Sequence, residues 1–397
     1  MIPVSFLRRQ SVFIEIAFLL ISMLSLACEK INLPDQSLPF EFKESPDSVL
    51  VKNSKIYSIT VYDSDSVSTL LLKYDNPLLE ESIADPSLIR GENGIFYLFS
   101  TESGKYPNVP IFKSKDLVNW YFVNTAFSKE TRPTSIDGNI WAPDINFIDG
   151  KYVMYYSMSR WGGEWDCGVG VAVSDHPYGP FSDYAILFDS RTINVQNSID
   201  PFYIEDGWKK YLFWGSHHGI YGIRLSNDGL SILNGEDKVQ IAGNGGEGVY
   251  IHKRNGYYYL FISIGTCCNG LSSTYKVMVG RAESLLGPYF DQQGKNMLES
   301  TGTVFLQGDE FVVGPGHNSE FITDDNGDDW VLYHGYLREK PELSRILFLD
   351  KVYWDNDWPL IPDQSPSISS EIPFFNDKSE KETLFKKISS FLSVFRH

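Results

Sequence analysis

Five polar residues of the types that take part in acid–base chemistry recur along the chain at similar intervals. They are Asp85, Asp144, Asp200, Glu247 and His317. Carboxylates that converge in one pocket repel each other when ionised, so at least one of them keeps its proton to a higher pH. A protonated carboxyl can donate a proton to a leaving group while an ionised neighbour removes a proton from water. These residues therefore form an acid–base site if the fold brings them together.

The elements that must position these residues are five similar segments. After each polar residue, an Asn-Gly or Asp-Gly pair precedes a run of aromatic and β-branched residues, which is the strongest short signal for a β-hairpin. The glycines of these pairs lie 56, 57, 49 and 71 residues apart, at Gly94, Gly150, Gly207, Gly256 and Gly327. This spacing is about that of a four-stranded propeller blade. If the strand before each hairpin is the innermost of its blade, all five polar residues meet at one central pocket. The sequence thus predicts an all-β, five-bladed β-propeller with catalytic residues in its central channel.

The composition narrows the class of ligand. The chain has 34 basic and 51 acidic residues, a net charge of −17, so a phosphate backbone is repelled and nucleic acid is excluded as a partner. A neutral polysaccharide would not be repelled. Aromatic residues make up 15% of the chain, more than a core alone needs, so some of them are available to line a sugar-binding cleft. A pair of carboxylates that acts as acid and base is what hydrolysis of a glycosidic bond requires.

The N-terminal segment has the pattern of a targeting signal. Arg8 and Arg9 precede an apolar run that is too short to span a bilayer. Residues 24–28 (LSLAC) resemble a bacterial lipoprotein signal, in which Cys28 is lipidated and becomes the mature N-terminus. An ordinary secretory signal with an incidental cysteine is the alternative. We expect an exported monomer that is lipid-anchored to the cell envelope and has no other contact with a membrane.

The remaining chain divides into three parts. We expect residues 28–47 to form a flexible tether, residues 48–362 to form the propeller, and residues 363–397 to form a tail. Within the tail, residues 379–395 carry apolar side chains at helical spacing and predict a docked helix. Three further cysteines, Cys167, Cys267 and Cys268, do not match the spacing of a zinc site. The adjacent pair could form a disulfide, Cys167 could pair with one of them, or all three could be free thiols.

Four motifs around the polar residues resemble those of glycoside hydrolase family 43, the five-bladed propeller hydrolases of arabinan, arabinoxylan and xylan. They are residues 84–90 (ADPSLIR), 141–145 (WAPDI), 197–201 (NSIDP) and 247–261 (EGVYIHKRNGYYYLF). They keep the order and spacing of the family, and with the repeats they span residues 83–360. Two further segments, 267–277 (CCNGLSSTYKV) and 314–318 (GPGHN), are similar to those of endo-acting α-1,5-arabinanases.

The resemblance implies a role for each polar residue. Asp85 would be the general base, Glu247 the general acid, and Asp200 the carboxylate that tunes and orients the acid. His317 would hold a calcium-like ion, largely through water. Because members of this family invert the anomeric configuration, the carboxyls of Asp85 and Glu247 should leave room for a water between them.

The substrate-binding residues that we expect in the cleft are Trp141, Asp144, Asn197 and His317. The family resemblance implies hydrolysis of α-1,5-linked L-arabinan at internal bonds. The tryptophan-rich segment 160–167 (RWGGEWDC) departs from the Ser/Gly-rich loop of arabinanases, which leaves open an exo-acting arabinofuranosidase or β-xylosidase. A non-catalytic sugar-binding propeller is a third reading, although such a protein has no need of all three carboxylates.

Overall fold

The structure is a computed structural model, and it describes residues 60–62, 69–71 and 73–375. The predicted signal segment, the lipidation site Cys28, the tether and the predicted C-terminal helix lie outside these residues. No helix within the described part of the chain is long and apolar enough to cross a membrane. Strands β1 (Thr60–Tyr62) and β2 (Thr69–Leu71) pair with each other in a small antiparallel sheet.

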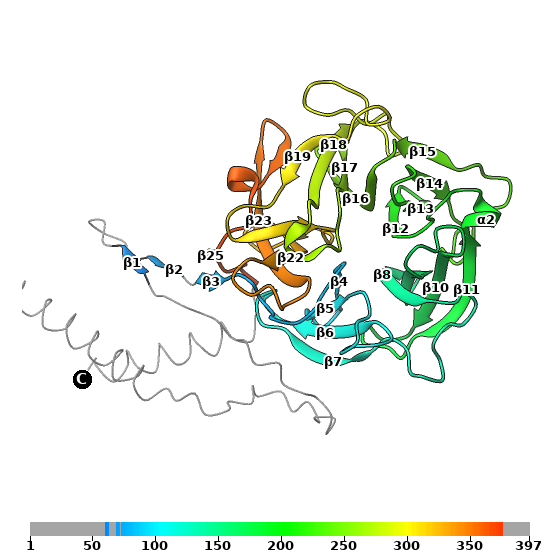
Figure 1. Ribbon diagram of the computed structural model, residues 1–397, viewed down its shortest axis with the longest axis horizontal. Coiled ribbons are helices and arrows are strands. Elements are labelled where there is room, and N and C mark those ends of the chain that lie inside the picture. Colours follow the sequence, from blue (N-terminus) through cyan, green and yellow to red (C-terminus); the bar gives the residue numbers. More distant parts are fainter. Residues whose placement is uncertain (1–59, 63–68, 72, 376–397) are drawn as a thin grey trace, which may run out of the picture. The chain divides into compact units, whose positions relative to one another are not determined.

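Five antiparallel sheets follow one another around a common centre as the blades of a propeller (Figure 1). Blade 1 has β4 (Ser87–Arg90), β5 (Phe96–Phe99), β6 (Pro110–Ser114) and β7 (Tyr121–Thr125). Blade 2 has β8 (Asn139–Ile148), β9 (Lys151–Ser159), β10 (Gly168–Ser174) and β11 (Ser182–Asp189), and the one-turn helix α2 (Ser190–Ile193) follows it. Blade 3 has β12 (Phe202–Asp206), β13 (Lys209–Trp214), β14 (Ile220–Arg224) and β15 (Val239–Ala242).

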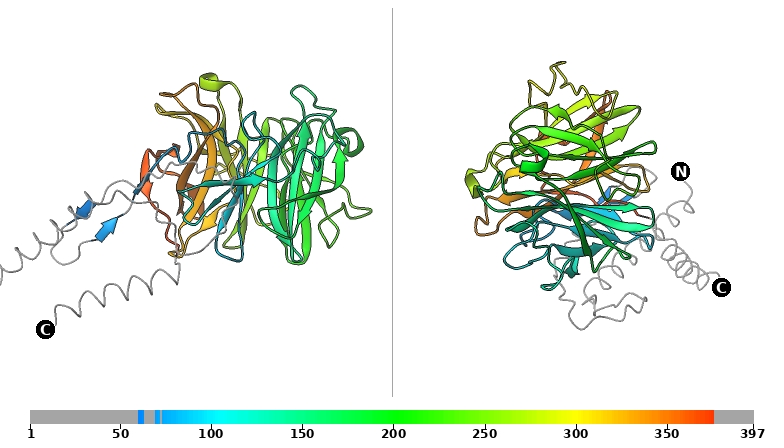
Figure 2. Two further views of the ribbon diagram at one scale, coloured as in Figure 1. Left: turned by 90° about the horizontal axis from the view of Figure 1, so that it is seen from below. Right: turned by 90° about the vertical axis from the view of Figure 1, so that its right-hand side faces the viewer.

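The last two blades complete the ring. Blade 4 has β16 (Gly246–Arg254), β17 (Tyr257–Ile264), β18 (Lys276–Ala282) and β19 (Thr303–Leu306), with the short 3-10 helix η1 (Gly270–Ser272) between β17 and β18. Blade 5 has β20 (Val312–Gly316), β21 (Ile322–Thr323), β22 (Asp329–Leu337), β23 (Ile346–Asp355) and β24 (Trp358–Leu360). In Figure 2 the strands run between the two faces of the ring. The predicted five-bladed β-propeller is therefore confirmed.

The hairpins form where the Asn/Asp-Gly pairs predicted them. In blade 2, Ile148 of β8 pairs with Lys151 of β9, and the two residues between them are Asp149 and Gly150. Their φ angles are 49° and 82°, so both residues have the left-handed conformation that a two-residue hairpin turn of this kind requires. The aromatic run that follows each turn is buried, as β9 is along almost its whole length.

The cores lie between neighbouring blades, because each blade presents both of its faces to another sheet. Between blades 2 and 3, the rings of Tyr155 and Tyr203 stack with their centroids 5.6 Å apart. Between blades 4 and 5, Phe261 and Phe321 pack at 5.0 Å. Aromatic side chains fill the widening space between twisted sheets, and this use of them explains much of the aromatic content of the chain.

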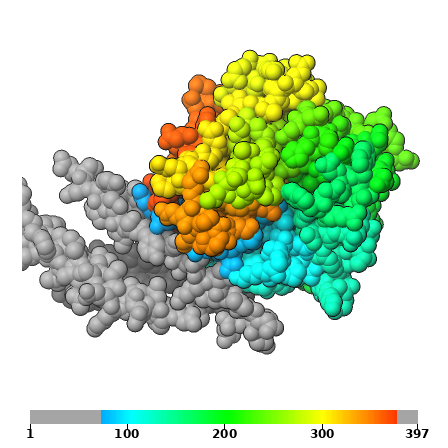
Figure 3. Space-filling view, in the orientation of Figure 1, coloured from blue at the N-terminus to red at the C-terminus, as the bar shows by residue number. Residues whose placement is uncertain are grey.

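A segment before blade 1 closes the ring against blade 5. Along residues 76–83, the backbone N–H groups of Leu78 and Ile83 donate to the carbonyls of Leu347 and Arg345 at 2.9 and 2.8 Å. Blade 5 therefore lies directly beside blade 1, as Figure 3 shows for the orange and the blue to cyan residues. Strand β3 (Lys73–Asp75) also pairs with β25 (Ser369–Glu371), which follows the 3-10 helix η2 (Pro362–Gln364). The first part of the predicted tail thus contributes a strand, and the folded unit continues beyond residue 362.

Candidate active site

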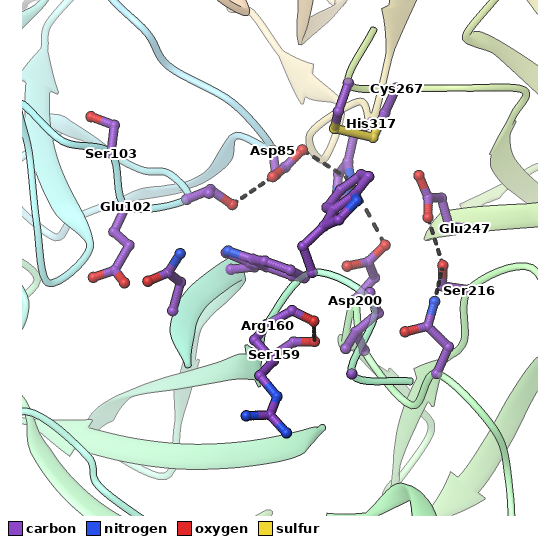
Figure 4. A pocket seen from close by; sticks show the side chains of 18 of the residues that line it. Asp85, Glu102, Ser103, Ser159, Arg160, Asp200, Ser216, Glu247, Cys267 and His317 are labelled. Carbon is purple, nitrogen blue, oxygen red and sulfur yellow. Dashed lines mark hydrogen bonds and ion pairs between the residues drawn. A yellow bond between two sulfur atoms is a disulfide. The ribbon is translucent and has the colours of Figure 1, made fainter. Parts of the chain in front are cut away.

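A cleft of about 1020 Å³ opens at the centre of the ring, and all five blades contribute residues to its lining. Asp85, Asp200, Glu247 and His317 all line it. The close-up in Figure 4 shows the three carboxylates arranged around the His317 side chain. Each carboxylate is at most 8% exposed, so the charges lie in a largely desolvated place. The structure therefore confirms the prediction that these four residues lie together at the centre of the ring.

Three of these residues enter the cleft from a bend just before or just after an innermost strand, while Glu247 lies within β16 directly before the bend at Gly248. Asp85, Asp200 and His317 have φ angles of 55°, 59° and 48°, in the left-handed region that residues other than glycine seldom adopt. Such a bend turns the side chain away from the blade and into the channel. Backbone strain of this kind persists only where the surroundings hold it in place.

Hydrogen bonds from one blade to the next hold these bends. The backbone N–H of the bent residue donates to a polar side chain near the end of the second strand in the preceding blade. The pairs are Ala142 to Thr101, Asp200 to Ser157 and His317 to Ser263, each at 2.8 Å, and Asp85 to Nδ1 of His334 at 3.1 Å. The site is thus positioned by the interfaces between blades and not by any single blade.

Asp144 is the one residue of the five that the structure does not bring to the cleft. In blade 2, Ala142 has the left-handed φ of 39° and makes the interblade hydrogen bond. A register shift between Trp141 and Asp144 moves the carboxylate down the strand and away from the lining. There Asp144 is 4% exposed and accepts a hydrogen bond from the backbone N–H of Tyr203 at 2.8 Å. The expectation that Asp144 faces substrate is therefore corrected: it links blade 2 to blade 3.

Asp85 is surrounded by groups that favour its ionised form. Burial by itself would raise the pKa of this carboxyl, but Arg345, His317 and the Thr101 hydroxyl act against burial, and the pKa lies below its usual value. The Thr101 hydroxyl donates to Oδ2 at 2.5 Å, and Nη1 of Arg345 lies 3.3 Å from Oδ1. Asp85 is therefore a carboxylate at neutral pH.

The surroundings of Asp200, unlike those of Asp85, favour the protonated form of the carboxyl. Burial raises the pKa of Asp200 well above its usual value, and the charges of Glu247 and Asp85 raise it further. The backbone N–H of Gly248, which donates to Oδ2 at 3.1 Å, and the charge of Arg345 act against this rise. Asp200 therefore keeps its proton to a higher pH than Asp85 does.

A chain of polar side chains orients Glu247. Nδ2 of Asn197 donates to the Ser216 hydroxyl at 2.8 Å, and this hydroxyl donates to Oε2 of Glu247 at 2.6 Å. Nε2 of His217 lies 3.4 Å from the same oxygen. Asn197, which we expected to bind substrate, thus lines the cleft and also fixes the hydroxyl that holds Glu247.

The imidazole of His317 lies between the carboxyls of Asp85 and Asp200. Its Nδ1 is 3.3 Å from Asp85 and 4.0 Å from Asp200. Within residues 60–62, 69–71 and 73–375, no three or more His, Cys, Asp or Glu side chains group as a metal-binding set. The donor set around His317 therefore does not by itself form a cation site, and we derive no chemical step through a metal. The calcium-like ion expected there stays a prediction.

The cleft walls combine aromatic, charged and sulfur-containing side chains. Trp141 lines the cleft as expected, and Trp161 on the tryptophan-rich loop lines it with a ring that is 80% exposed. Cys267 and Cys268 are joined in a disulfide and lie on the blade 4 side, while Cys167 is a buried free thiol. Of the three arrangements that the sequence left open, the structure therefore contains the disulfide between neighbours.

Several residues of the site were absent from the sequence predictions. Thr101, Ser216 and His334 each follow the aromatic run of a second strand, so the same repeats that gave the carboxylates also contain a signal for them. Arg345 has no such signal, because it lies 260 residues from the Asp85 that it pairs with.

A five-bladed propeller whose central cleft holds three carboxyls, one with a lowered and one with a raised pKa, has the features of a propeller glycosidase. Comparison with known proteins gives the family. Residues 74–359 match Glycosyl hydrolases family 43, and the chain belongs to this family.

Relatives and solved structures agree with this assignment. The chain is 33% identical over 312 residues to an extracellular exo-α-(1→5)-L-arabinofuranosidase of Cellvibrio japonicus, covering 71% of this chain and 87% of the relative. It is also 33% identical over 296 residues to an extracellular endo-α-(1→5)-L-arabinanase of Bacillus subtilis, covering 70% and 87%. The structure of a Cellvibrio cellulosa α-L-arabinanase complexed with arabinohexaose matches with a TM-score of 0.64 and 31% identity, over 70% of this chain and 94% of that one.

Proposed function

We propose that this protein is an inverting glycosidase that cleaves α-1,5-linked L-arabinan at internal bonds. The observation that carries the proposal is the contrast between the two carboxylate environments. Arg345, His317 and the Thr101 hydroxyl favour the ionised form of Asp85, whereas burial and the charge of Glu247 raise the pKa of Asp200 well above its usual value. One site thus holds a base and an acid at the same pH, as an inverting mechanism requires.

In this mechanism Glu247 donates its proton to the glycosidic oxygen as the bond to the anomeric carbon breaks. Asp85 removes a proton from a water that attacks the opposite face of the sugar. Asp200 orients the acid and repels the negative charge that develops on it. Ser216 holds Glu247 in place through the bond at 2.6 Å, and Arg345 and Thr101 hold Asp85.

The size of the cleft supports attack within a polymer. Cavities of roughly 300–1,000 Å³ accommodate drug-sized ligands, and this one reaches about 1020 Å³, so it has room for several sugar units. Its lining from all five blades gives contacts on both sides of the carboxylates. Arabinohexaose, the ligand in the complex of a structural relative, is an oligosaccharide of several sugar units.

An exo-acting arabinofuranosidase is the second candidate, because one relative at 33% identity carries that activity in its name. Trp161, on the loop that departs from the family pattern, lines the cleft, and an exo-acting enzyme would use such a loop to close one end of the groove. The extracellular relatives also support export of this chain. The lipid anchor at Cys28 remains a prediction from the sequence alone.

Product analysis on linear α-1,5-arabinan tests the proposal, with aryl α-L-arabinofuranoside and aryl β-xyloside as comparison substrates. Mixed arabino-oligosaccharides released from the start support the endo-arabinanase, and monosaccharide alone supports the exo-enzyme. Glu247→Ala should abolish release from arabinan, because its leaving group needs a proton. Wild-type rates in that variant would contradict the role of Glu247, and no release by the wild-type protein from any substrate would favour the sugar-binding propeller.

A further inference from the structure

Tyr275 is a buried residue directly behind the active site, and the mechanism above gives it no role. It precedes β18 and is 2% exposed, and it is not part of the cleft lining. Its hydroxyl is buried without a hydrogen-bond partner. An unpartnered buried hydroxyl costs stability and calls for an explanation.

The register of blade 4 directs Tyr275 toward Glu247. Glu247 of β16 pairs with Ser263 of β17, and Ser263 pairs with Val277 of β18. Directly paired residues project from the same face of a sheet, and so do residues two apart on one strand. Tyr275 therefore shares a face with Glu247 and lies diagonally from it. This is the face toward blade 5, because the Ser263 hydroxyl on it accepts from the backbone N–H of His317.

Close packing fixes the Tyr275 ring in this place. The ring stacks on the imidazole of His334 with centroids 5.8 Å apart and planes 14° from parallel. A Cβ on Gly316 would lie 2.2 Å from a ring carbon of Tyr275, so only glycine allows this approach. Gly316 and His334 thus pack closely against the tyrosine ring and restrict its movement.

The surroundings keep the Tyr275 hydroxyl a proton donor. Burial raises its pKa well above the usual value, and Glu247, Asp200 and Asp85 raise it further, with Glu247 the strongest of the three. His334 beside it is neutral, because burial lowers the pKa of that imidazole. The hydroxyl can therefore donate to a carboxylate but cannot take a proton from the acid.

We propose that Tyr275 is a positioning residue that hydrogen-bonds Glu247 when this residue becomes negatively charged on giving up its proton. In the structure the hydroxyl meets no hydrogen-bond geometry with any partner, although Glu247 is close enough to raise its pKa. As the leaving oxygen takes the proton, charge develops on Glu247 beside Asp200 in a desolvated place. A fixed donor that bonds only then stabilises the transition state more than the ground state.

The substitution Tyr275→Phe tests this inference. The activity readout of this test rests on the proposed glycosidase function. A hydrogen bond to a charged group stabilises enough to make a difference of about 10- to 100-fold in rate. We expect kcat to fall by about that factor on arabinan and on phenyl arabinofuranoside. On 2,4-dinitrophenyl arabinofuranoside, whose leaving group departs without protonation, we expect little change. An equal fall on all substrates, or no fall on arabinan, would overturn the proposal.

A second measurement does not depend on any substrate. In protein labelled with carboxyl-¹³C glutamate, the Glu247 signal, assigned with Glu247→Gln, can be followed by NMR as the pH is raised. Losing a donor to the charged form favours the protonated form, so the midpoint should move up by about one pH unit in Tyr275→Phe. An unchanged midpoint would overturn the inference even if the wild-type protein cleaves no arabinan, and the proposed function would then fail separately on the activity assay.

Tyr289→Phe is the matched control. Tyr289 is also buried in blade 4, but its hydroxyl donates to the carbonyl of Leu285 at 2.7 Å. This variant should lose stability and keep both the wild-type rates and the Glu247 midpoint. Tyr275→Phe should behave in the opposite way, because removing an unpartnered hydroxyl leaves no broken hydrogen bond in the fold.

Discussion

The bond between Thr101 and Asp85 gives the sharpest test of how the proposed base is set up. In Thr101→Val the shape is kept and the hydroxyl is lost. The variant loses the donor to Oδ2 of Asp85 at 2.5 Å and the acceptor for the N–H of Ala142 at 2.8 Å. Ala142 is 3% exposed and does not line the cleft, so water does not replace the acceptor for its N–H.

Two magnitudes follow from these contacts. A hydrogen bond to a charged group contributes about 1.5–3 kcal/mol, which corresponds to a rise in the Asp85 pKa of roughly one to two pH units. The unpartnered Ala142 N–H costs about 1–3 kcal/mol of unfolding free energy. Because the folded-state pKa of Asp85 is depressed, its bond to Thr101 stabilises the fold above the unfolded pKa of about 3.9. This contribution is lost as the pH falls through the folded-state value.

The assay is the pH dependence of kcat/KM on arabinan, with urea unfolding at neutral pH beside it. The acid limb of the profile reports the protonation of the catalytic base in the free enzyme. This limb should therefore move to higher pH by about one unit or more, while the alkaline limb stays in place. Thr125→Val is the control, since it loses a bond to the carbonyl of Phe127 at 2.7 Å, away from the cleft. If Thr101→Val loses stability but its acid limb does not move, Asp85 is not the titrating base and our account of the site is refuted.

Two further substitutions separate the cleft from its supports. Asp144→Asn keeps an oxygen that accepts from the backbone N–H of Tyr203, and it removes the repulsion from Glu320 that, together with burial, raises the Asp144 pKa. We therefore expect kcat/KM to stay within about threefold of the wild-type value. A hundredfold loss at unchanged stability would mean that Asp144 contacts substrate. Trp161→Ala removes a ring that is 80% exposed on the cleft wall. We expect the KM for arabinan to rise roughly three- to tenfold, with little change in kcat or in the midpoint of thermal unfolding. An unchanged KM would mean that sugars do not contact this loop.

The sequence predicted the fold well because its signals are local. An Asn/Asp-Gly pair and an aromatic run specify a hairpin without reference to the rest of the chain, and five such pairs at blade spacing specify the ring. Asp85, Asp200 and Glu247 were located for the same reason. Each lies shortly before its own hairpin, within 7 to 9 residues of the hairpin glycine, so the repeat alone assigned them to the centre.

Predictions were less accurate where position depends on backbone register or on another blade. Asp144 was misplaced because counting back from the hairpin does not reveal the register shift after Trp141. Arg345 and Tyr275 act on residues of distant segments, and no local pattern marks them. The strand β25 was missed because its partner β3 lies almost 300 residues earlier, and three residues are too few to show alternation.

The closure of the ring has a consequence for how the enzyme acquires activity during folding. The contacts that join the ends of the ring connect residues separated by about 250 to 275 positions, including Tyr74 with Leu349 and Asp85 with Arg345. Such contacts form late, because a very long loop must close first. A nascent chain that lacks blade 5 therefore contains Asp85, Asp200 and Glu247 but neither Arg345 nor His317, which favour the ionised form of Asp85. Recovery of activity during refolding should thus follow the last step of assembly, and the proposed base works only in a finished molecule.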